Sequence, residues 1–159
     1  AYEIRLSLVG SEMCIRDSIC RSPLADGILR FKAKRENLNW IIDSAGTYSG
    51  HQGEHPDHRA ITVARKNGVD ISSLVARPFS KKDFDQFDKI YVMDSSNYRD
   101  VLKLAADKED EQKVEMIMNV VLPGKNKPVP DPYFGGDDGF DEVFKMLDEA
   151  CEKIIKMER

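Results

Sequence analysis

Apolar residues recur at helical spacing from residue 24 onward. Leu24 and Ile28 begin a run of apolar positions that predicts a helix over residues 22–37. We expect Ser22 to cap this helix and Pro23 to take its first position, since both residue types favour helix starts. The same reasoning predicts three further helices, over residues 57–67, 95–106 and 139–157.

Short apolar runs between these helices predict strands. Residues 40–45 and 89–93 have the length and the apolar character of buried strands. Residues 114–121 form a further apolar run, and residues 2–9 alternate between apolar and polar side chains as a strand does. The charged residues 107–112 are expected to form a solvated turn.

Strands that alternate with helices through short connections predict an α/β fold. We expect a single domain, with a four-stranded parallel sheet and helices on both faces in a three-layer sandwich. The 159 residues suffice for one such domain. The carboxyl ends of parallel strands share one edge of the sheet, where ligands of such folds bind. Residues 20–22, the glycine-rich loop 46–55 and residues 131–133 should therefore lie on one side.

The amino-acid composition argues against several kinds of binding partner. With 41% hydrophobic residues, 33% charged residues and a net charge of -4, the chain lacks the basic character of nucleic-acid-binding proteins. It also has no apolar run long enough to span a membrane. We therefore expect neither nucleic acid nor a membrane as a partner. The cysteines are too few and too scattered for a disulfide framework, which favours a reducing cytoplasm; they are Cys14, Cys20 and Cys151. The three histidines lack further ligands at suitable spacing, so no metal or other cofactor is expected.

The start of the first helix is a candidate anion site. Free N–H groups at a helix N-terminus would point back over Cys20 and Arg21 and attract phosphate. A guanidinium at this place holds two phosphate oxygens at once, which a lysine cannot do with the same geometry. The same residues also fit a capped surface helix with a solvated arginine, so the local pattern leaves both interpretations open.

Three motifs in a fixed order give a more specific indication. They are Ile19-Cys20-Arg21-Ser22-Pro23, Asp43-Ser44-Ala45-Gly46-Thr47 and Asp131-Pro132-Tyr133. At these separations they resemble the low-molecular-weight protein tyrosine phosphatase family over residues 19–157. The resemblance implies a flavodoxin-like or Rossmann-like sandwich of the phosphotyrosine phosphatase I type. It also implies metal-free hydrolysis of phosphotyrosine, or another aryl phosphate monoester, through a cysteinyl-phosphate intermediate.

The resemblance assigns roles to individual residues. The family's loop has the form Cys, five residues, Arg, and Ser or Thr, so Arg21 matches the phosphate-holding arginine and Ser22 the hydroxyl that hydrogen-bonds the thiolate. Asp131 matches the general acid that protonates the leaving phenol. Arg77 and Asp94 match supporting positions. The remaining contacts are expected from the phosphate-binding residues Ile19, Cys20, Arg21 and Ser22 and from the tyrosines that wall the substrate ring, Tyr48 and Tyr133.

The family's nucleophile is missing from its position in this chain. Counting back from Arg21 over five intervening residues leads to position 15, which is Ile15. An isoleucine side chain cannot attack phosphorus. Cys14 leaves six intervening residues, and one extra residue displaces its sulfur by up to about 3 Å. Because smaller misplacements already slow a reaction strongly, the chain as written is predicted to be inactive.

Residues 1–18 resemble translated sequencing adapter. Residues 13–17 can be written ATG TGT ATA AGA GAC, which matches a transposase mosaic end, and residues 8–12 and 1–4 back-translate to flanking adapter. We therefore expect this segment to be an artefact. Residues 19–159 would then be a phosphatase domain that lacks its first strand and the start of its phosphate loop. The alternative is a genuine, divergent amino terminus.

Other functions fit the same residues in part. A phosphoarginine phosphatase differs mainly within the loop that has been lost. An arsenate reductase shares the fold and a similar anion loop, but it needs further redox cysteines and has no evident use for Asp131. If the amino terminus is genuine, a non-catalytic phosphate-binding pseudoenzyme describes the chain best, since Arg21 can hold an anion without a nucleophile. We expect a phosphotyrosine protein as substrate, and a monomer or weak dimer.

Overall fold

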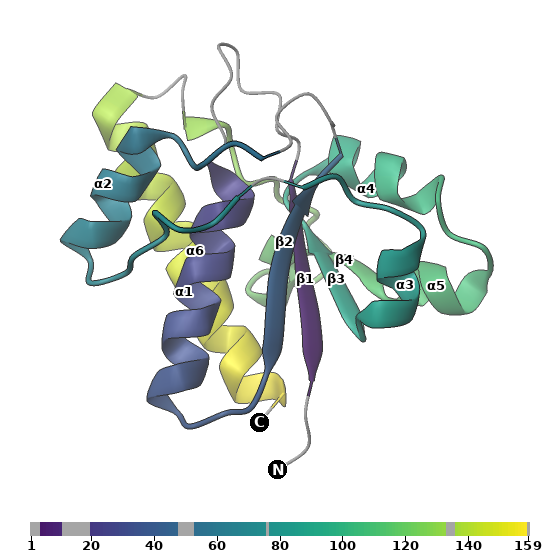
Figure 1. Ribbon diagram of the computed structural model, residues 1–159. Coiled ribbons are helices and arrows are strands. Elements are labelled where there is room, and N and C mark those ends of the chain that lie inside the picture. The colour runs from purple at the N-terminus through teal and green to yellow at the C-terminus, as the bar shows by residue number, and fades with distance from the viewer. Residues whose placement is uncertain (1–3, 11–19, 48–52, 76, 133–135, 159) are drawn as a thin grey trace.

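A parallel sheet of four strands forms the centre of the fold, in the order β2-β1-β3-β4 (Figure 1). The computed structural model describes residues 4–10, 20–47, 53–75, 77–132 and 136–158. Within these ranges the strands are β1 (Arg5–Gly10), β2 (Ile41–Gly46), β3 (Lys89–Val92) and β4 (Val114–Met116).

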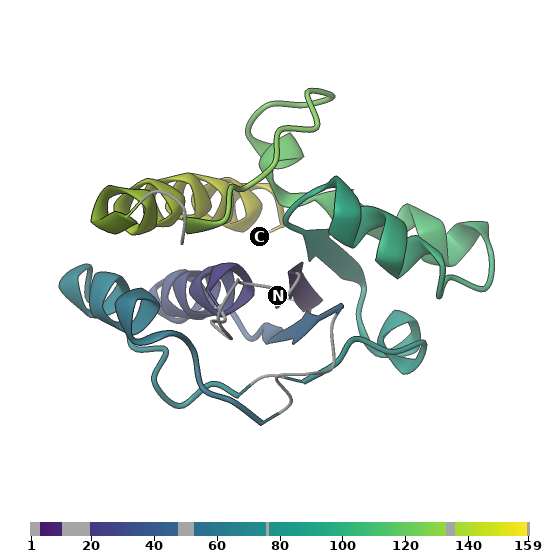
Figure 2. The ribbon, with the colours of Figure 1, turned by 90° about the horizontal axis from the view of Figure 1, so that it is seen from above.

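Helices cover both faces of this sheet (Figure 2). One side carries α1 (Arg21–Arg35), α2 (His58–Lys66) and α6 (Gly136–Glu158). The other side carries α3 (Lys82–Gln86), α4 (Ser95–Leu102) and α5 (Lys108–Gln112), and a short 3-10 helix, η1 (Ile117–Val120), follows β4. The predicted α/β sandwich with a four-stranded parallel sheet is confirmed.

Each face of the sheet has its own hydrophobic core. Successive side chains of a strand point to opposite faces, so β1 contributes to both cores. Leu6 and Leu8 join the core beneath α1 and α6, whereas Val9 joins Val92 in the core beneath α3 and α4. The central strand is therefore buried on both sides, as parallel sheets require.

This central strand comes from the segment 1–18. β1 pairs with β2 and β3, and Leu8 lies in register with Ser44 and Tyr91. Residues of this segment therefore take the place of a first strand in the sheet, and the absence of a first strand of their own from residues 19–159 stays a prediction. Whether the segment derives from adapter depends on its coding DNA, and that stays a prediction.

Ser7 fits this central place poorly. Its side chain is fully buried, and within the described structure its hydroxyl has no hydrogen-bond partner. Because an unsatisfied buried hydroxyl costs about 1–3 kcal/mol, we expect Ser7→Ala to raise the free energy of unfolding by about 1 kcal/mol. Urea denaturation measures this, with the exposed Ser96→Ala as control, expected within about 0.5 kcal/mol of the parent. A lower stability of Ser7→Ala would contradict the prediction.

Two predicted elements differ from the structure. The predicted solvated turn over 107–112 contains the helix α5, which Asp107 caps by accepting from the backbone N–H of Asp110 at 2.9 Å. The strand expected over 114–121 ends at Met116, which is its last residue paired with β3. The chain then continues into η1.

Ion pairs join the last turn of α1 to the interior of α6. Lys32 Nζ lies 3.1 Å from Asp148 Oδ1 and 2.8 Å from Glu152 Oε2, and Arg35 Nη2 lies 3.1 Å from the same Glu152 oxygen. The hydrogen bond from Lys32, supported by Arg35, lowers the pKa of Glu152 to about 2. The carboxylate therefore stays charged down to unusually low pH.

The stability supplied by Glu152 should depend on pH. Its pKa in the folded state lies below the ordinary value of 4.5, so its contribution is present above that pH and is lost as the pH falls toward about 2. We expect Glu152→Gln to be less stable than the parent by up to about 1 kcal/mol at pH 7, since these pairs are partly exposed. The difference should vanish near pH 2. Thermal unfolding at both pH values measures it, with the exposed Glu149→Gln as control, and a pH-independent difference would contradict it.

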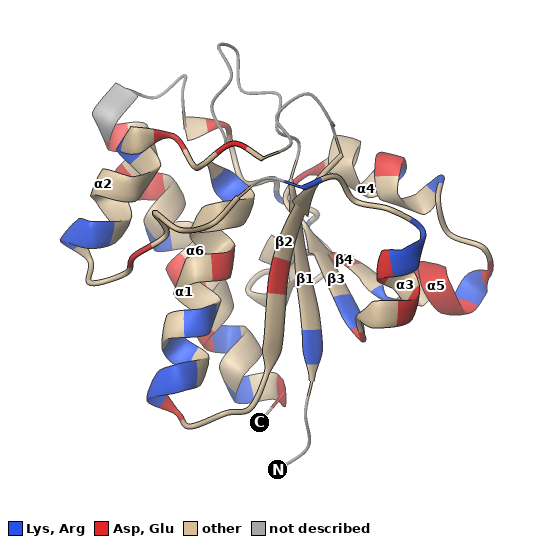
Figure 3. Ribbon diagram, in the orientation of Figure 1, with Lys and Arg blue, Asp and Glu red and all other residues tan. Residues whose placement is uncertain are grey.

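Charges of both signs are spread over the surface elements. Figure 3 shows both basic and acidic residues on α3 and α5, and mostly basic residues toward the end of α1. Among the described helices, none is both long and apolar enough to cross a lipid bilayer.

Candidate active site

Arg21 opens α1 at the edge of the sheet where β2 and β3 end (Figure 1). Its side chain is only 7% exposed. The Nη1 atom donates to Asp94 Oδ2 at 2.9 Å and to the carbonyl oxygen of Val129 at 2.6 Å. The guanidinium therefore joins the turn that follows β3 to the segment that leads to Asp131.

Asp94 is itself held in place by the cap of α4. Its Oδ1 atom accepts from the backbone N–H of Asn97 at 2.9 Å, and the Asn97 side chain accepts from the backbone N–H of Asp94 at 3.2 Å. This capping box fixes the carboxylate, so its second oxygen faces Arg21. One aspartate thus starts a helix and orients the candidate phosphate-holding side chain.

Val129 ties the acid-bearing segment to the sheet. Its backbone N–H donates to the carbonyl oxygen of Met93 at 2.9 Å, and its own carbonyl accepts from Arg21. The residue is fully buried, and Asp131 follows two positions later with its side chain partly exposed. The structure therefore brings Arg21 and the Asp131 segment together, although they lie far apart in the sequence.

The first turn of α1 is packed against the end of β1. The carbonyl of Cys20 accepts from the N–H of Leu24 at 3.2 Å, so the helix begins at Arg21. Ser22 lies inside the first turn, and the prediction that its side chain caps the helix is wrong. A methyl group built on Gly10 would lie 3.4 Å from Ser22 Cβ, which places the strand end directly beside this turn.

Arg77 braces the end of β2. Its side chain reaches Asp43 Oδ2 at 2.9 Å and Asp83 Oδ1 at 3.1 Å, and its backbone carbonyl accepts from the N–H of Gly46. The N–H of Thr47 donates to the carbonyl of Gly10 at 3.0 Å. These contacts support the base of the loop that carries Tyr48, in agreement with the supporting role expected for Arg77.

Several predicted residues fall outside the described parts of the chain. They are Cys14, Ile15, Ile19, Tyr48 and Tyr133. The bounds of the neighbouring elements still limit the connection between them. β1 ends at residue 10 and α1 begins at residue 21, so the residues 11–20 join them. That connection is longer than a loop of one cysteine and five residues.

Asp26 is a buried residue in this region that sequence reasoning missed. Its side chain is fully buried on α1, where it accepts from Arg30, and Arg30 also donates to the carbonyl of Ile42 on β2. Burial raises the pKa of the Asp26 carboxyl. The spacing of an aspartate four positions before an arginine on a helix was the available signal.

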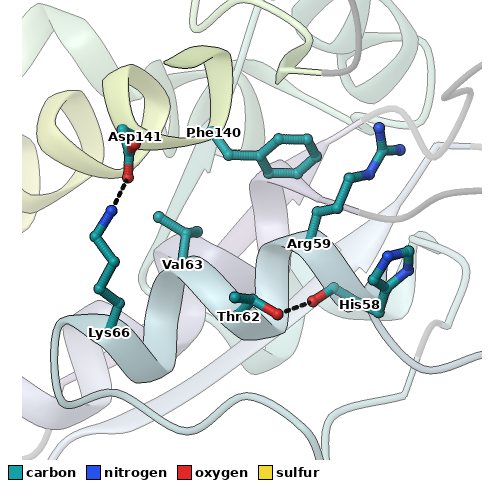
Figure 4. Close-up of a pocket in the computed structure, with 7 residues that line it drawn as sticks. All are labelled: His58, Arg59, Thr62, Val63, Lys66, Phe140 and Asp141. Carbon is teal, nitrogen blue, oxygen red and sulfur yellow. Dashed lines mark hydrogen bonds and ion pairs between the residues drawn. The ribbon is translucent and has the colours of Figure 1, made fainter. Parts of the chain in front are cut away.

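A cavity of about 430 Å³ lies between α2 and the first turns of α6 (Figure 4). The guanidinium carbon of Arg59 stands 4.9 Å from the ring centre of Phe140, and Lys66 Nζ lies 3.0 Å from Asp141 Oδ1. Both interactions join α2 to the first turns of α6. They hold the start of α6 in position.

The described residues include no group of three or more His, Cys, Asp or Glu side chains arranged to hold a metal ion. Two of the three histidines fall within the described parts. His55 Nδ1 lies 2.9 Å from the carbonyl oxygen of Leu74, and the side chain of His58 is exposed.

The described part of the site thus holds a buried arginine at the start of a helix, hydrogen-bonded to the segment that carries Asp131. The sequence profile described as "Low molecular weight phosphotyrosine protein phosphatase" matches residues 13–158. The chain belongs to this family. A low molecular weight phosphotyrosine protein phosphatase of Schizosaccharomyces pombe is 37% identical over 142 residues, which cover 87% of this chain and 90% of the relative.

Solved structures agree with the phosphatase family. A protein tyrosine phosphatase from Entamoeba histolytica superposes with a TM-score of 0.85 at 35% identity, covering 98% of this chain and 97% of its own. A structure described as YwlE arginine phosphatase is 19% identical, with a TM-score of 0.83 and coverage of 97% and 95%. At that identity the second likeness shows the fold alone. The family match and the Schizosaccharomyces pombe relative therefore carry the assignment of the chain to the phosphotyrosine protein phosphatases.

Proposed function

We propose that this chain carries the site of a protein tyrosine phosphatase whose nucleophile has been lost. The proposal rests on the position of Arg21. Its buried guanidinium donates a hydrogen bond to the carbonyl oxygen of Val129, two residues before Asp131. This contact supports a phosphate-holding role for Arg21 and a proton-donor role for Asp131. A phosphate monoester dianion repels nucleophiles, so its charge has to be neutralised before attack.

The reaction proposed for the intact site has two steps. A cysteine thiolate attacks phosphorus, the bond from phosphorus to the phenolic oxygen breaks, and Asp131 gives its proton to the leaving oxygen. Water then attacks the cysteinyl phosphate, Asp131 takes a proton from it, and the bond from sulfur to phosphorus breaks to release phosphate. Arg21 and the backbone N–H groups at the start of α1 hold the phosphoryl oxygens throughout.

The chain as written should not complete the first step. The residue at the family's nucleophile position is Ile15, and Cys14 stands one residue too early. We propose that residues 1–18 are adapter-derived and that β1 occupies the place of the natural first strand. The connection between β1 and α1, residues 11–20, supports this proposal, because it is longer than the family's loop of one cysteine and five residues.

Phosphotyrosine is the substrate that the relatives favour. The relative at 37% identity is named a phosphotyrosine protein phosphatase, whereas the structure described as an arginine phosphatase shares only 19% identity. We place the protein in a reducing cytoplasm, in keeping with its few and scattered cysteines, and expect a monomer or weak dimer. If residues 1–18 prove genuine, Ile15 instead favours a phosphate-binding pseudoenzyme.

Two experiments test the proposed function. The first reads the coding DNA across codons 1–19. A sequence that departs from adapter would overturn the proposal that residues 1–18 are adapter-derived. The second compares aryl phosphate hydrolysis by the chain as written and by a repaired chain. The repaired chain lacks residues 1–9, has an apolar strand at 10–14, carries Ile15→Cys, and has glycine and asparagine among residues 16–18.

A further inference from the structure

The segment that carries Asp131 runs directly against the start of α6. A Cβ atom built on Gly139 would lie only 2.7 Å from the carbonyl oxygen of Pro132, which is closer than Cβ atoms approach backbone oxygens in proteins. Glycine is therefore the residue that lets the helix and the segment meet at this distance. Any side chain here would require either α6 or Pro132 to move.

The start of α6 is the less movable of the two. Its next residue, Phe140, is buried and lies beneath the guanidinium of Arg59, and the ion pair of Asp141 with Lys66 follows (Figure 4). The apolar side chains over the following turns are buried in the core beneath α1; they are Val143, Leu147, Ala150 and Ile154. A shift of α6 would disturb all of these contacts.

The acid-bearing segment is held at its other end. Val129 is bound through its N–H to Met93 and through its carbonyl to Arg21. A displacement of Pro132 is therefore taken up between Val129 and Pro132. Asp131 lies in that interval.

We propose that Gly139 is a positioning residue, which sets the place of Asp131 by allowing α6 to contact the backbone of Pro132. The inference rests on the proposed function in one respect only, the role of Asp131 as the acid. Its geometric part concerns the chain as written. A purely local effect of Gly139→Ala would be a more stable helix, because alanine is the better helix former.

Amide spectra of the chain as written test the geometric part. Gly139→Ala is expected to shift the amide resonance of Asp131, while the Val129 N–H, which stays bound to Met93, keeps its rate of hydrogen exchange. Glu142→Ala, at an exposed site on the same helix, should leave both unchanged. An unchanged Asp131 resonance or a faster exchange of the Val129 N–H in Gly139→Ala would overturn the proposal. So would loss of the folded spectrum, because Gly139 would then serve the fold as a whole.

Kinetics of the repaired chain test the consequence for catalysis. A displaced acid slows phenyl phosphate, whose leaving group needs a proton, more than p-nitrophenyl phosphate, whose leaving group needs little help. We expect Gly139→Ala to lower kcat for phenyl phosphate by about 10-fold to 100-fold and for p-nitrophenyl phosphate by less than about threefold. Equal losses for both substrates would overturn the positioning role. If the parent repaired chain hydrolyses neither substrate, the proposed function fails, and the amide spectra alone decide the inference.

Discussion

The repaired chain is expected to hydrolyse p-nitrophenyl phosphate at least about a thousand times faster than the chain as written, since loss of a covalent nucleophile commonly costs more than that. The repair restores a thiol at position 15, with five residues between it and Arg21, and places it directly after a strand. In that register the sulfur faces the N–H groups at the start of α1. A helix N-terminus and a nearby guanidinium favour the thiolate.

Two matched variants separate the thiol from the rest of the repair. The repaired chain with Ile15→Ser in place of Ile15→Cys keeps the strand and the loop length but lacks the thiol, so it should be as inactive as the chain as written. In the unrepaired chain, Cys14→Ser should change nothing. Robust turnover by the unrepaired chain that Cys14→Ser abolishes would contradict both the register count and the proposed inactivity.

Replacing Arg21 should have the second largest effect. Arg21→Lys keeps the positive charge but loses the planar group, which can bond Asp94, the Val129 carbonyl and two phosphate oxygens together. In the repaired chain we expect kcat/KM to fall by about a hundredfold or more, as when one preorganised donor is removed from a reaction site. In the chain as written we expect about 1–2 kcal/mol lower stability, because buried partners lose hydrogen bonds.

The control for this substitution is Arg99→Lys, which changes an exposed arginine on α4. It should alter stability by less than about 0.5 kcal/mol and leave kcat/KM unchanged. Urea denaturation and initial rates at several aryl phosphate concentrations give both quantities. Equal stability of Arg21→Lys and Arg99→Lys would show that the bonds to Asp94 and Val129 contribute nothing to the fold.

Local patterns predicted the regular elements well where the whole signal lay within one stretch of sequence. The helix expected over 57–67 is α2, which Asp57 caps and which ends before Gly68 with its positive φ of 83°. Patterns failed where a partner decided the outcome. An apolar run over 114–121 reads as one strand, but only its first residues find hydrogen-bond partners on β3.

The candidate site divides in the same way. The order of its motifs and the identity of Arg21 and Asp131 are visible in the sequence. The contact of Arg21 with Val129, across 108 positions, is not visible there. Asp26 was missed because its burial beneath β2 depends on how α1 packs against the sheet.

The family resemblance and the count from Arg21 back to Ile15 both follow from the sequence alone, because the spacing of motifs is a property of the linear chain. Only the tertiary structure showed that residues from the adapter-like segment form the central strand, and that Gly139 meets the backbone of Pro132. These contacts join distant parts of the chain. They depend on side-chain volumes packed across elements, which no local pattern of hydrophobic and polar residues records.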